Sequence, residues 1–476
     1  MRHERSHTKI IATTGPATHS KEILEQMIHE GVDVFRINFS HGTHEEHQKT
    51  IRSIQQLNNE LGSKVAILAD LQGPKLRVGE MVNNQIDLVD GQEFSFVTTP
   101  CTGDCEKAYI SYEQLPRDAT AGESILVDDG KLVFEVIESN GKDCVRTRVI
   151  AGGTLSNRKG VNLPQTKVTL PSLTEKDIKD VRFALDHQVD WIALSFVRSE
   201  KDILDLKGLV DAHPTRALVI AKIEKPEALN EIDEIIDAAD GIMVARGDLG
   251  VEVDFHRVPL IQKSIIKKCN EKSKPVIVAT QMMESMIENP TPTRAEANDV
   301  ANAVLDGTDT VMLSGETSVG KYPVQTIRNM QKIIDSTETD EFLFYREHQP
   351  SLVSETFLPD SICYNAVRLA EQVEAAAIIS LTYSGYTPIK ISSHRPRAPI
   401  FTFTMNQDLI RHLSLIWGVR TYFFAECYDV NEYLDYTEEF LVSQNLLKKG
   451  DLVVHVGSFP ILEKGKTNMM KLTRVT

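Results

Sequence analysis

Short runs of apolar residues alternate along most of the chain with stretches whose apolar residues recur at helical spacing. Between the runs, Ser20 can cap a helix that ends at Gly31, and Thr43 with Glu46 forms a capping box. The runs are apolar enough to be strands of a buried parallel sheet. There are eight, at residues 9–14, 32–39, 65–71, 191–196, 218–223, 242–245, 276–280 and 310–313. Eight β/α repeats predict an α/β fold, a (β/α)₈ TIM barrel whose active site lies at the carboxyl ends of its strands.

The barrel pattern is interrupted after the third predicted strand. Residues 76–160 lose the helical period, and turns such as Asp129-Gly130 separate short apolar runs at 93–97, 124–127, 132–137 and 145–149. This predicts an inserted all-β lid domain over the carboxyl ends of the strands, where it can close on a substrate and exclude water. Gly152, Gly153 and Gly160 are candidates for its hinge.

A second α/β rhythm follows the barrel. An acidic stretch at 335–341 and the residues up to 354 predict a linker. The barrel would then comprise residues 1–75 and 161–345, and residues 350–476 would form a C-terminal domain. Its predicted strands lie at 376–381, 400–403, 421–424 and 452–456, with helices such as 361–373 between them. We expect an open, mostly parallel α/β sheet with a regulatory role.

Polar side chains stand at or just past the end of every predicted barrel strand. They are Thr14; Arg36, Asn38 and Ser40; Asp70; Ser195 and Arg198; Lys222 and Glu224; Arg246 and Asp248; Thr280 and Gln281; and Ser314 and Glu316. A barrel that is only a scaffold does not need a polar residue at each of these positions, whereas an enzyme barrel does. The pattern therefore predicts an enzyme.

Residues 217–248 contain the most informative pair of strand ends. One strand delivers Lys222 and Glu224, and the next delivers Arg246 and Asp248. Adjacent parallel strands joined by a helix place their carboxyl ends side by side, so these groups should converge. Glu224 with Asp248 is a sparse, all-oxygen site of the kind Mg²⁺ takes, and Lys222 could neutralise a developing oxyanion. The alternative is that these charges only cap helices or pair with one another.

Composition narrows the class of protein. The chain has 476 residues, 41% of them hydrophobic and 25% charged, which suits two or three globular domains. Its net charge of −16 argues against a nucleic-acid partner. The six cysteines have no regular spacing, which indicates reduced thiols and a cytoplasmic location. Neither a signal peptide nor a run of roughly 18 apolar residues is present, so no membrane partner is expected.

Two other clusters look superficially like metal sites. Cys101 and Cys105 form the only close cysteine pair, but no second pair or nearby histidine completes a site. His41, His44 and His47 recur every three residues at the start of a predicted helix, where such residues are more often a solvated surface. We do not assign a metal to either cluster.

Seven motifs together resemble the pyruvate kinase family. They are 34–42 (VFRINFSHG), 70–77 (DLQGPKLR), 158–164 (RKGVNLP), 221–227 (AKIEKPE), 244–252 (VARGDLGVE), 279–286 (ATQMMESM) and 313–316 (LSGE). The resemblance spans the barrel, the insertion and the C-terminal domain, in order and with the right spacing. It implies an enzyme of glycolysis that transfers the phosphoryl group of phosphoenolpyruvate to ADP, giving pyruvate and ATP. The chain begins almost at the first barrel strand, so we expect it to lack the extra N-terminal helical segment of some members.

The resemblance also implies roles for individual residues. Glu224 and Asp248 would bind Mg²⁺, Lys222 would stabilise charge on the phosphoryl group and the enolate oxygen, and Arg36 would hold the phosphoryl group. The amides of Gly247 and Asp248, at a helix start, would receive the substrate carboxylate.

Further implied roles concern the proton and the nucleotide. Thr280 would lie near the methylene carbon where a proton arrives, with Ser314 and Glu316 as a supporting proton network. The residues that would contact nucleotide phosphates are Asn38, Phe39, Ser40, His41, Arg77 and Lys159.

One departure from the family pattern concerns a monovalent cation. In much of the family K⁺ lies among residues that match Asn38, Ser40, Asp70 and the backbone of Leu71. Members that require K⁺ usually have Thr-Lys after the aspartate and Glu after Gly-Pro, whereas this chain has Leu71-Gln72 and then Lys75. This resembles the potassium-independent branch, in which a lysine ammonium replaces the ion, so we expect activity without K⁺. A vestigial cation site remains an open alternative.

The C-terminal domain contains the loop LTYSGYTP at 381–388. Its small residues resemble the family's sugar-phosphate effector loop: Thr382, Ser384, Gly385 and Thr387. Such residues can cradle a phosphate with backbone N–H groups. An ordinary strand-to-helix turn with good caps is the alternative. The family is typically tetrameric, so the resemblance also implies a homotetramer.

Two rival functions follow from the same residues. One is another Mg²⁺-dependent barrel enzyme acting on pyruvate or an enolate, such as an aldolase or lyase. That enzyme would need Glu224 and Asp248 but not Arg77, Lys159 or a lid. The other is a catalytically silent relative that binds effectors. Such a relative would be expected to have lost Lys222 or a metal ligand.

Overall fold

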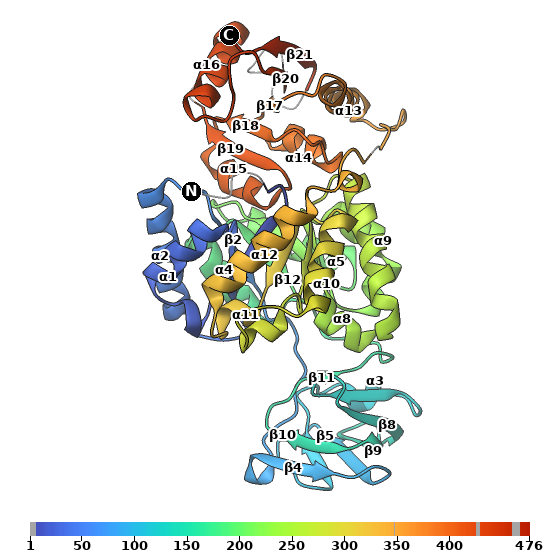
Figure 1. Cartoon of the computed structure of the whole chain (residues 1–476). Coiled ribbons are helices and arrows are strands. Elements are labelled where there is room, and N and C mark those ends of the chain that lie inside the picture. The colour runs from blue at the N-terminus through green and yellow to red at the C-terminus, as the bar shows by residue number, and fades with distance from the viewer. Residues whose placement is uncertain (1–5, 347, 425–428, 459–466) are drawn as a thin grey trace.

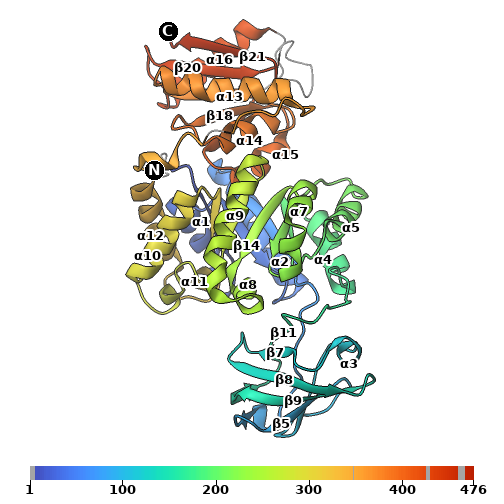
Figure 2. The same cartoon turned by 90° about the vertical axis from the view of Figure 1, so that its right-hand side faces the viewer.

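The structure, a computed structural model, describes residues 6–346, 348–424, 429–458 and 467–476. Figure 1 shows three parts stacked along one axis, with the barrel between the inserted β domain and the C-terminal domain. The view in Figure 2, turned by 90°, shows the same order. None of the helices in the described ranges is long and apolar enough to cross a membrane.

Eight parallel strands close the barrel. They are β1 (Lys9–Thr13), β2 (Val34–Asn38), β3 (Ala66–Asp70), β12 (Trp191–Leu194), β13 (Leu218–Ile223), β14 (Gly241–Ala245), β15 (Val276–Ala279) and β16 (Thr310–Leu313). Pairing of β1 with β16, in which Lys9 lies opposite Thr310, completes the ring. All eight predicted strands are confirmed. They could be recognised because almost every residue in them is buried, on the outer face by helices and on the inner face by the barrel core.

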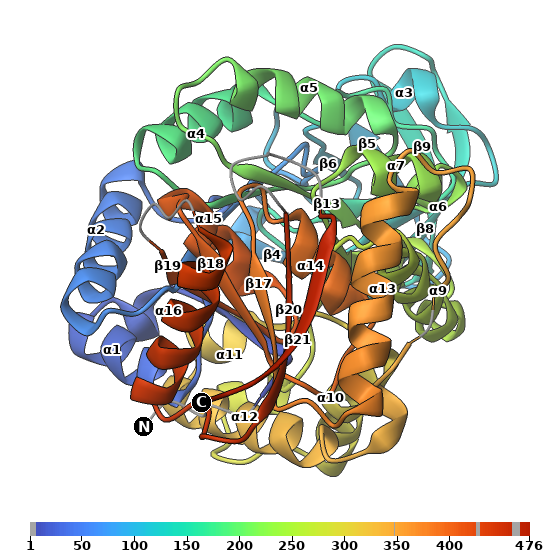
Figure 3. The same ribbon diagram turned by 90° about the horizontal axis from the view of Figure 1, so that it is seen from above.

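Helices surround the strands, as the view along the barrel in Figure 3 shows. The predicted end signals form: Ser20 accepts a hydrogen bond from the Ile23 amide, Gly31 adopts φ 118°, and Thr43 with Glu46 makes a reciprocal capping box. The outer helices are α1 (Lys21–Glu30), α2 (His44–Leu61), α4 (Glu175–Asp186), α5 (Glu200–Asp211), α6 (Pro226–Asn230), α7 (Ile232–Ala238), α9 (Val258–Glu271), α10 (Arg294–Asp306) and α12 (Pro323–Thr337). Two short helices follow strand ends, α8 (Arg246–Glu252) and α11 (Gly315–Ser318).

The inserted domain has two sheets. The smaller pairs β4 (Gln85–Leu88) with β10 (Gly153–Ser156). The larger has the order β11 (Val161–Asn162), β7 (Ser124–Val127), β8 (Leu132–Ser139), β9 (Cys144–Ala151), β5 (Glu93–Val97) and β6 (Lys107–Tyr109). The short helix α3 (Leu115–Asp118) packs near β9. Because β11 pairs with β7 and Leu163 and Leu170 pack against the domain's core, we propose that this domain extends to Leu170 rather than ending at residue 160.

The C-terminal domain is an open sheet of five strands. Its order is β19 (Val419–Phe423), β18 (Ile400–Thr404), β17 (Ala377–Leu381), β20 (Leu452–Gly457) and β21 (Met469–Arg474). The first four are parallel and correspond to the predicted strands, and β21 is an antiparallel edge strand that was not predicted. Its helices are α13 (Phe357–Gln372), α14 (Tyr386–Ser393), α15 (Gln407–His412) and α16 (Val430–Ser443).

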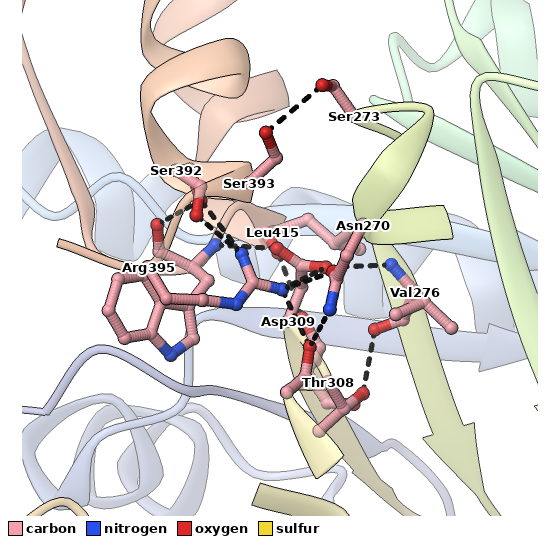
Figure 4. A network of polar contacts seen from close by, with 12 residues as sticks. Asn270, Ser273, Val276, Thr308, Asp309, Ser392, Ser393, Arg395 and Leu415 are labelled. Atoms are coloured by element: carbon pink, nitrogen blue, oxygen red, sulfur yellow. Dashed lines mark hydrogen bonds and ion pairs between the residues drawn. The ribbon is translucent and has the colours of Figure 1, made fainter. Parts of the chain in front are cut away.

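The C-terminal domain packs against the amino ends of the barrel strands. Arg395 is 1% exposed, and its Nη2 lies 2.7 Å from the Gly307 carbonyl and 3.1 Å from Asp309 Oδ2, just before β16 (Figure 4). Leu415 is fully buried against the inward-facing residues of the barrel. The carboxyl ends of the strands lie at the opposite end of the barrel and face the inserted domain.

Candidate active site

Four strand ends meet around Lys222, which is the last residue but one of β13. Its Nζ lies 3.1 Å from Asp70 Oδ1 at the end of β3 and 2.9 Å from Glu224 Oε1. It also donates a 2.8 Å hydrogen bond to the Ser195 hydroxyl after β12. The other oxygen of Asp70 lies 2.6 Å from Arg36 Nε on β2. The structure therefore brings two cations and two carboxylates into one buried cluster.

The opposite charges in this cluster keep Lys222 protonated and Asp70 ionised. Burial disfavours the ammonium form of Lys222, but the carboxylates of Asp70 and Glu224 outweigh burial and hold the pKa of Lys222 above its usual value. Burial likewise disfavours a charged Asp70, yet Lys222 and Arg36 hold its pKa below the usual value. Lys222 is consequently a permanent cation at neutral pH and not a proton donor.

Glu224 and Asp248 differ in how they are engaged. Glu224 is 1% exposed, and its Oε2 accepts a 2.8 Å hydrogen bond from the Phe196 amide. Asp248 lies in the first turn of α8, and within the described residues its carboxylate has neither a hydrogen bond nor an ion pair. Burial raises the pKa of Glu224, Lys222 opposes that rise, and the negative charge of Asp248 adds to it. Two close carboxylates, one without a partner, fit a hard divalent cation such as Mg²⁺.

The start of α8 is tied to the loop after β15. The Gly247 amide, which was expected to receive a substrate carboxylate, donates a 2.7 Å hydrogen bond to Thr280 Oγ1 in this structure. Thr280 and Gln281 both have positive φ, 69° and 53°. Arg246 holds this strained loop through a 2.7 Å bond to the Thr280 carbonyl. Non-glycine residues held in this backbone region often mark functional sites.

Ser314 and Glu316 lie beside the same strand ends but form a separate cluster. Glu316 is buried, and its two oxygens accept hydrogen bonds from the Ser314 amide at 2.7 Å and the Met283 amide at 3.1 Å. Burial raises the pKa of Glu316. Within the described residues no hydrogen bond joins Glu316 to Thr280, so a proton path between them would need an intervening water or substrate.

The oxygens proposed for a monovalent cation already have donors in the protein. Asn38 Oδ1 accepts from the Ser40 amide at 3.0 Å, and the Leu71 carbonyl accepts from the Ser195 hydroxyl at 2.7 Å. The carboxylate of Asp70 faces Lys222 and Arg36, as described above. Three of the four groups proposed for the ion therefore face donors or cations of the protein.

The predicted nucleotide residues come from both the barrel and the inserted domain. In the loop after β2, the Phe39 amide donates a hydrogen bond to the Asp70 carbonyl. His41 lies at the end of this loop, with much of its side chain exposed. Partial burial lowers the pKa of His41, and the charges of Arg77 and Lys75 lower it further, which places both cations near His41. Lys159 lies farther into the inserted domain, where its Nζ is 2.9 Å from Asp128 Oδ1.

A small pocket lies between the barrel and the inserted domain. Lys75, Asp248 and Arg198 line it, together with Asp129 and Glu252. A wider pocket of about 580 Å³ adjoins it and shares Lys75 and Asp248. The wider pocket beside Asp248 has room for a polyanionic ligand, and Asp129 of the inserted domain contributes to its wall.

The first turn of α4 contributes contacts that the sequence interpretation missed. Lys176 Nζ donates a 2.7 Å hydrogen bond to the Phe39 carbonyl, and Asp177 Oδ1 accepts from the Gly73 amide at 3.1 Å. One helical turn thus holds the loops after both β2 and β3. The Thr174–Asp177 capping box predicts a helix start there, but it does not reveal these long-range contacts.

The predicted effector loop is the turn between β17 and α14. Thr382 Oγ1 accepts from the Gly385 amide at 3.0 Å, and Gly385 has φ 89°. Ser384 is exposed, and Thr387 Oγ1 lies 2.7 Å from Thr467 Oγ1. A phosphate cradle and a well-capped turn both fit this geometry.

The fold and the site define a (β/α)₈-barrel enzyme that gathers fixed cations around a pair of metal-type carboxylates, under an inserted β domain. Comparison with known proteins narrows this class. A family model for the pyruvate kinase barrel domain matches residues 5–327, and one for the pyruvate kinase alpha/beta domain matches residues 360–473.

Individual relatives match nearly the whole chain. A pyruvate kinase from Geobacillus stearothermophilus is 45% identical over 470 residues, covering 98% of this chain and 80% of that protein. One from Corynebacterium glutamicum is 42% identical, covering 97% of this chain and 96% of that protein. The crystal structure of a pyruvate kinase from Cryptosporidium parvum has a TM-score of 0.93 and 36% identity, covering 99% and 96% of the two chains. The chain belongs to the pyruvate kinase family, and it is a phosphate-transferring enzyme.

Proposed function

We propose that this enzyme transfers the phosphoryl group of phosphoenolpyruvate to ADP, giving pyruvate and ATP, and acts in cytoplasmic glycolysis. The observation that carries the proposal is the position of Lys222, a buried cation between Asp70 and Glu224 with Asp248 close by. Phosphoryl transfer requires mainly positioning and neutralisation of charge, and this cluster supplies both.

Each residue of the cluster has a proposed role. Glu224 and Asp248 would hold Mg²⁺, which when bound neutralises the substrate carboxylate and phosphate. Lys222 would stabilise the oxygen that becomes an enolate when the phosphoryl group leaves. Arg36 is oriented by Asp70 and by a 2.9 Å bond from Nη1 to Thr13 Oγ1, so within the described residues its Nη2 remains available for the phosphoryl group.

The proton that completes pyruvate has to come from another group. The raised pKa of Lys222 argues against that residue as the donor. Thr280 is a candidate for the residue next to the methylene carbon. Its hydroxyl is held between the Gly247 amide and the Ala279 carbonyl, at 2.7 and 2.6 Å. Ser314 and Glu316 would support it through water.

ADP would bind between the loop at 38–41 and the inserted domain. Arg77 supports this placement because its charge acts on His41, across the boundary between the two domains. Lys159 would reach the phosphates on closure of the inserted domain. A second Mg²⁺ would arrive with the nucleotide, since its phosphates need a counter-charge.

We propose that activity does not require K⁺. Lys75 lies in the pocket beside Asp248, and it supplies a fixed positive charge there. The oxygens of Asn38, Asp70 and Leu71 already face donors or cations of the protein. A monovalent ion would therefore gain little by binding among them.

We also propose a homotetramer regulated through the loop that contains Thr382, Ser384, Gly385 and Thr387. Two exposed apolar groups support self-association. One lies before and within α9, where Phe255 is 82% and Leu260 is 72% exposed. The other lies before and within α13, where Val353 is 94% and Leu358 is 73% exposed. A sugar phosphate is the proposed effector.

A direct assay tests the proposed reaction. The protein is incubated with phosphoenolpyruvate, ADP and Mg²⁺, and ³¹P NMR follows the conversion of phosphoenolpyruvate to ATP while pyruvate is measured separately. Equal amounts of ATP and pyruvate are expected. Release of inorganic phosphate without ATP, or cleavage of a carbon–carbon bond, would favour one of the rival barrel reactions.

A further inference from the structure

A buried carboxylate at the end of α8 joins three elements around the site. Glu252 is 4% exposed, and its Oε1 lies 2.6 Å from Lys225 Nζ. The same oxygen accepts a 2.8 Å hydrogen bond from Asn162 Nδ2. Lys225 and Asn162 are each 8% exposed, so this contact is largely shielded from water. Ion pairs in such surroundings are weakly screened and hold their geometry well.

Each partner in this contact comes from a segment that matters for the proposed reaction. Lys225 directly follows Glu224, and Glu252 ends the short helix that contains Asp248. Asn162 belongs to β11, the last strand of the inserted domain before the chain returns to the barrel. Glu252 therefore connects both candidate metal ligands to the connection between the two domains.

The sheet itself does not fix the separation of the two ligands. Pairing between β13 and β14 ends where Ile223 lies opposite Val244, so Glu224 and Asp248 both lie beyond the last paired residues. The ion pair between Lys225 and Glu252 is a direct side-chain connection between these two loops. Beyond the last paired residues of the sheet, this ion pair can therefore hold the two segments at a fixed separation.

Two further observations separate this contact from an ordinary buried ion pair. Glu252 Oε2 is buried without a hydrogen-bond partner in the described residues, which native proteins seldom tolerate at a purely structural position. In addition, the inserted domain comes close to α8 at a second place. A Cβ atom built on Gly130, in the turn between β7 and β8, would lie 3.8 Å from Val251 Cγ1. The last turn of α8 therefore meets the inserted domain at two places.

We propose that Glu252 is a positioning residue with two separable roles. Through Lys225 it sets the spacing of Glu224 and Asp248 for a divalent cation, and through Asn162 it fixes the orientation of the inserted domain. The inference rests on the proposed function, because it assigns Glu224 and Asp248 to the metal. It adds that the Glu252 carboxylate links metal binding to the position of the inserted domain.

Direct metal binding tests the first role. Mn²⁺ replaces Mg²⁺, and electron paramagnetic resonance of free Mn²⁺ gives its Kd without substrate or turnover. Glu252→Gln keeps the shape and the acceptor for Asn162 but removes the charge that holds Lys225. The Kd is expected to rise roughly 10- to 100-fold, as for other groups that orient metal ligands. Glu288→Gln, in an exposed ion pair with Lys321, is the matched control and should bind Mn²⁺ like the wild type.

A double variant distinguishes positioning from simple loss of stability. Glu252→Gln alone leaves the Lys225 ammonium buried without its partner, so the melting temperature should fall. Adding Lys225→Met removes that uncompensated charge and should restore much of the melting temperature, while Mn²⁺ affinity stays low because the connection is still missing. Recovery of Mn²⁺ affinity together with stability would overturn the proposal. So would a Kd for Glu252→Gln within about twofold of wild type, which is well below the effect expected.

Asn162→Ala tests the second role. It leaves the pair between Lys225 and Glu252 intact, so Mn²⁺ affinity should stay near wild type. The inserted domain should take up a wider range of orientations, seen as a larger radius of gyration in small-angle X-ray scattering, and the KM for ADP should rise. An unchanged scattering profile and KM would refute this role. Failure of the wild-type protein to bind Mn²⁺ at all would instead refute the proposed function.

Discussion

Replacing Asp70 by Asn should change the pH profile of the reaction, not only its rate. Asp70 is 1% exposed and faces two cations, Lys222 at 3.1 Å and Arg36 at 2.6 Å. The substitution keeps the shape of the side chain and removes its charge. Lys222 then retains Glu224 and Asp248 as counter-charges but loses the largest of the three attractions that offset its burial.

The size of the effect follows from the geometry. Two unit charges 3.1 Å apart attract by about 5 kcal/mol at an effective dielectric constant of about 20. Each 1.36 kcal/mol corresponds to one pKa unit, so even a fraction of this energy is large on a pH scale. The pKa of Lys222 should therefore fall in the variant. Because the protonated form carries the proposed function, activity should be lost as the pH rises through the lowered pKa.

The assay is kcat and kcat/KM for phosphoenolpyruvate from about pH 6 to about pH 10, a range that ends just below the usual lysine pKa. Wild-type activity should not be limited by Lys222 on the alkaline side, whereas Asp70→Asn should show a new alkaline decline. Asp190→Asn removes a similarly buried charge, 2.8 Å from Arg411 at the other end of the barrel, and should lower stability without changing the profile. A profile for Asp70→Asn that is only scaled down from wild type would show that Asp70 does not hold Lys222 in its charged form.

Three further predictions follow from other contacts. Activity should be the same when K⁺ is replaced by tetramethylammonium, and Lys75→Glu should create a K⁺ requirement; steady-state rates in the two salts check both. Lys176→Met should raise the KM for ADP more than that for phosphoenolpyruvate, because its 2.7 Å bond holds the Phe39 carbonyl in the nucleotide loop, and Lys176→Arg should restore part of the loss. Arg395→Leu should remove the contact with Asp309 at the domain junction and cost about 3–5 kcal/mol, seen by calorimetry as an earlier, separate unfolding of the C-terminal domain.

The barrel could be predicted from the sequence because its strands are unambiguous. Residues in β13 and β14 are nearly all buried, and an apolar run of that kind between two helical stretches has few other interpretations. Convergence of Lys222 with Glu224 then follows from where parallel strands end. The edge strand β21 was missed because its residues are mostly half-buried or exposed and include Lys471 and Arg474, so it has no continuous apolar run.

The side-chain partners within the site could not be predicted. The sequence places Asp70 at a strand end, but it does not show that one carboxylate would face both Lys222 and Arg36. The contact between Lys225 and Glu252 joins residues that are neighbours only after folding, and a glutamate at the end of a helix has no distinguishing pattern. The end of the inserted domain is hard to place from the sequence, because β11 is only two residues long and contains the polar Asn162.

Turnover by Lys222→Met, measured together with Mn²⁺ binding by the same variant, shows whether the Lys222 ammonium is needed for phosphoryl transfer. The substitution removes the ammonium from between Asp70 and Glu224 while leaving both candidate metal ligands in place. We expect kcat for the conversion of phosphoenolpyruvate and ADP to fall by roughly 10³-fold or more, while the variant still folds and binds Mn²⁺. A variant that folds, binds Mn²⁺ and turns over at a rate near that of wild type would contradict this expectation.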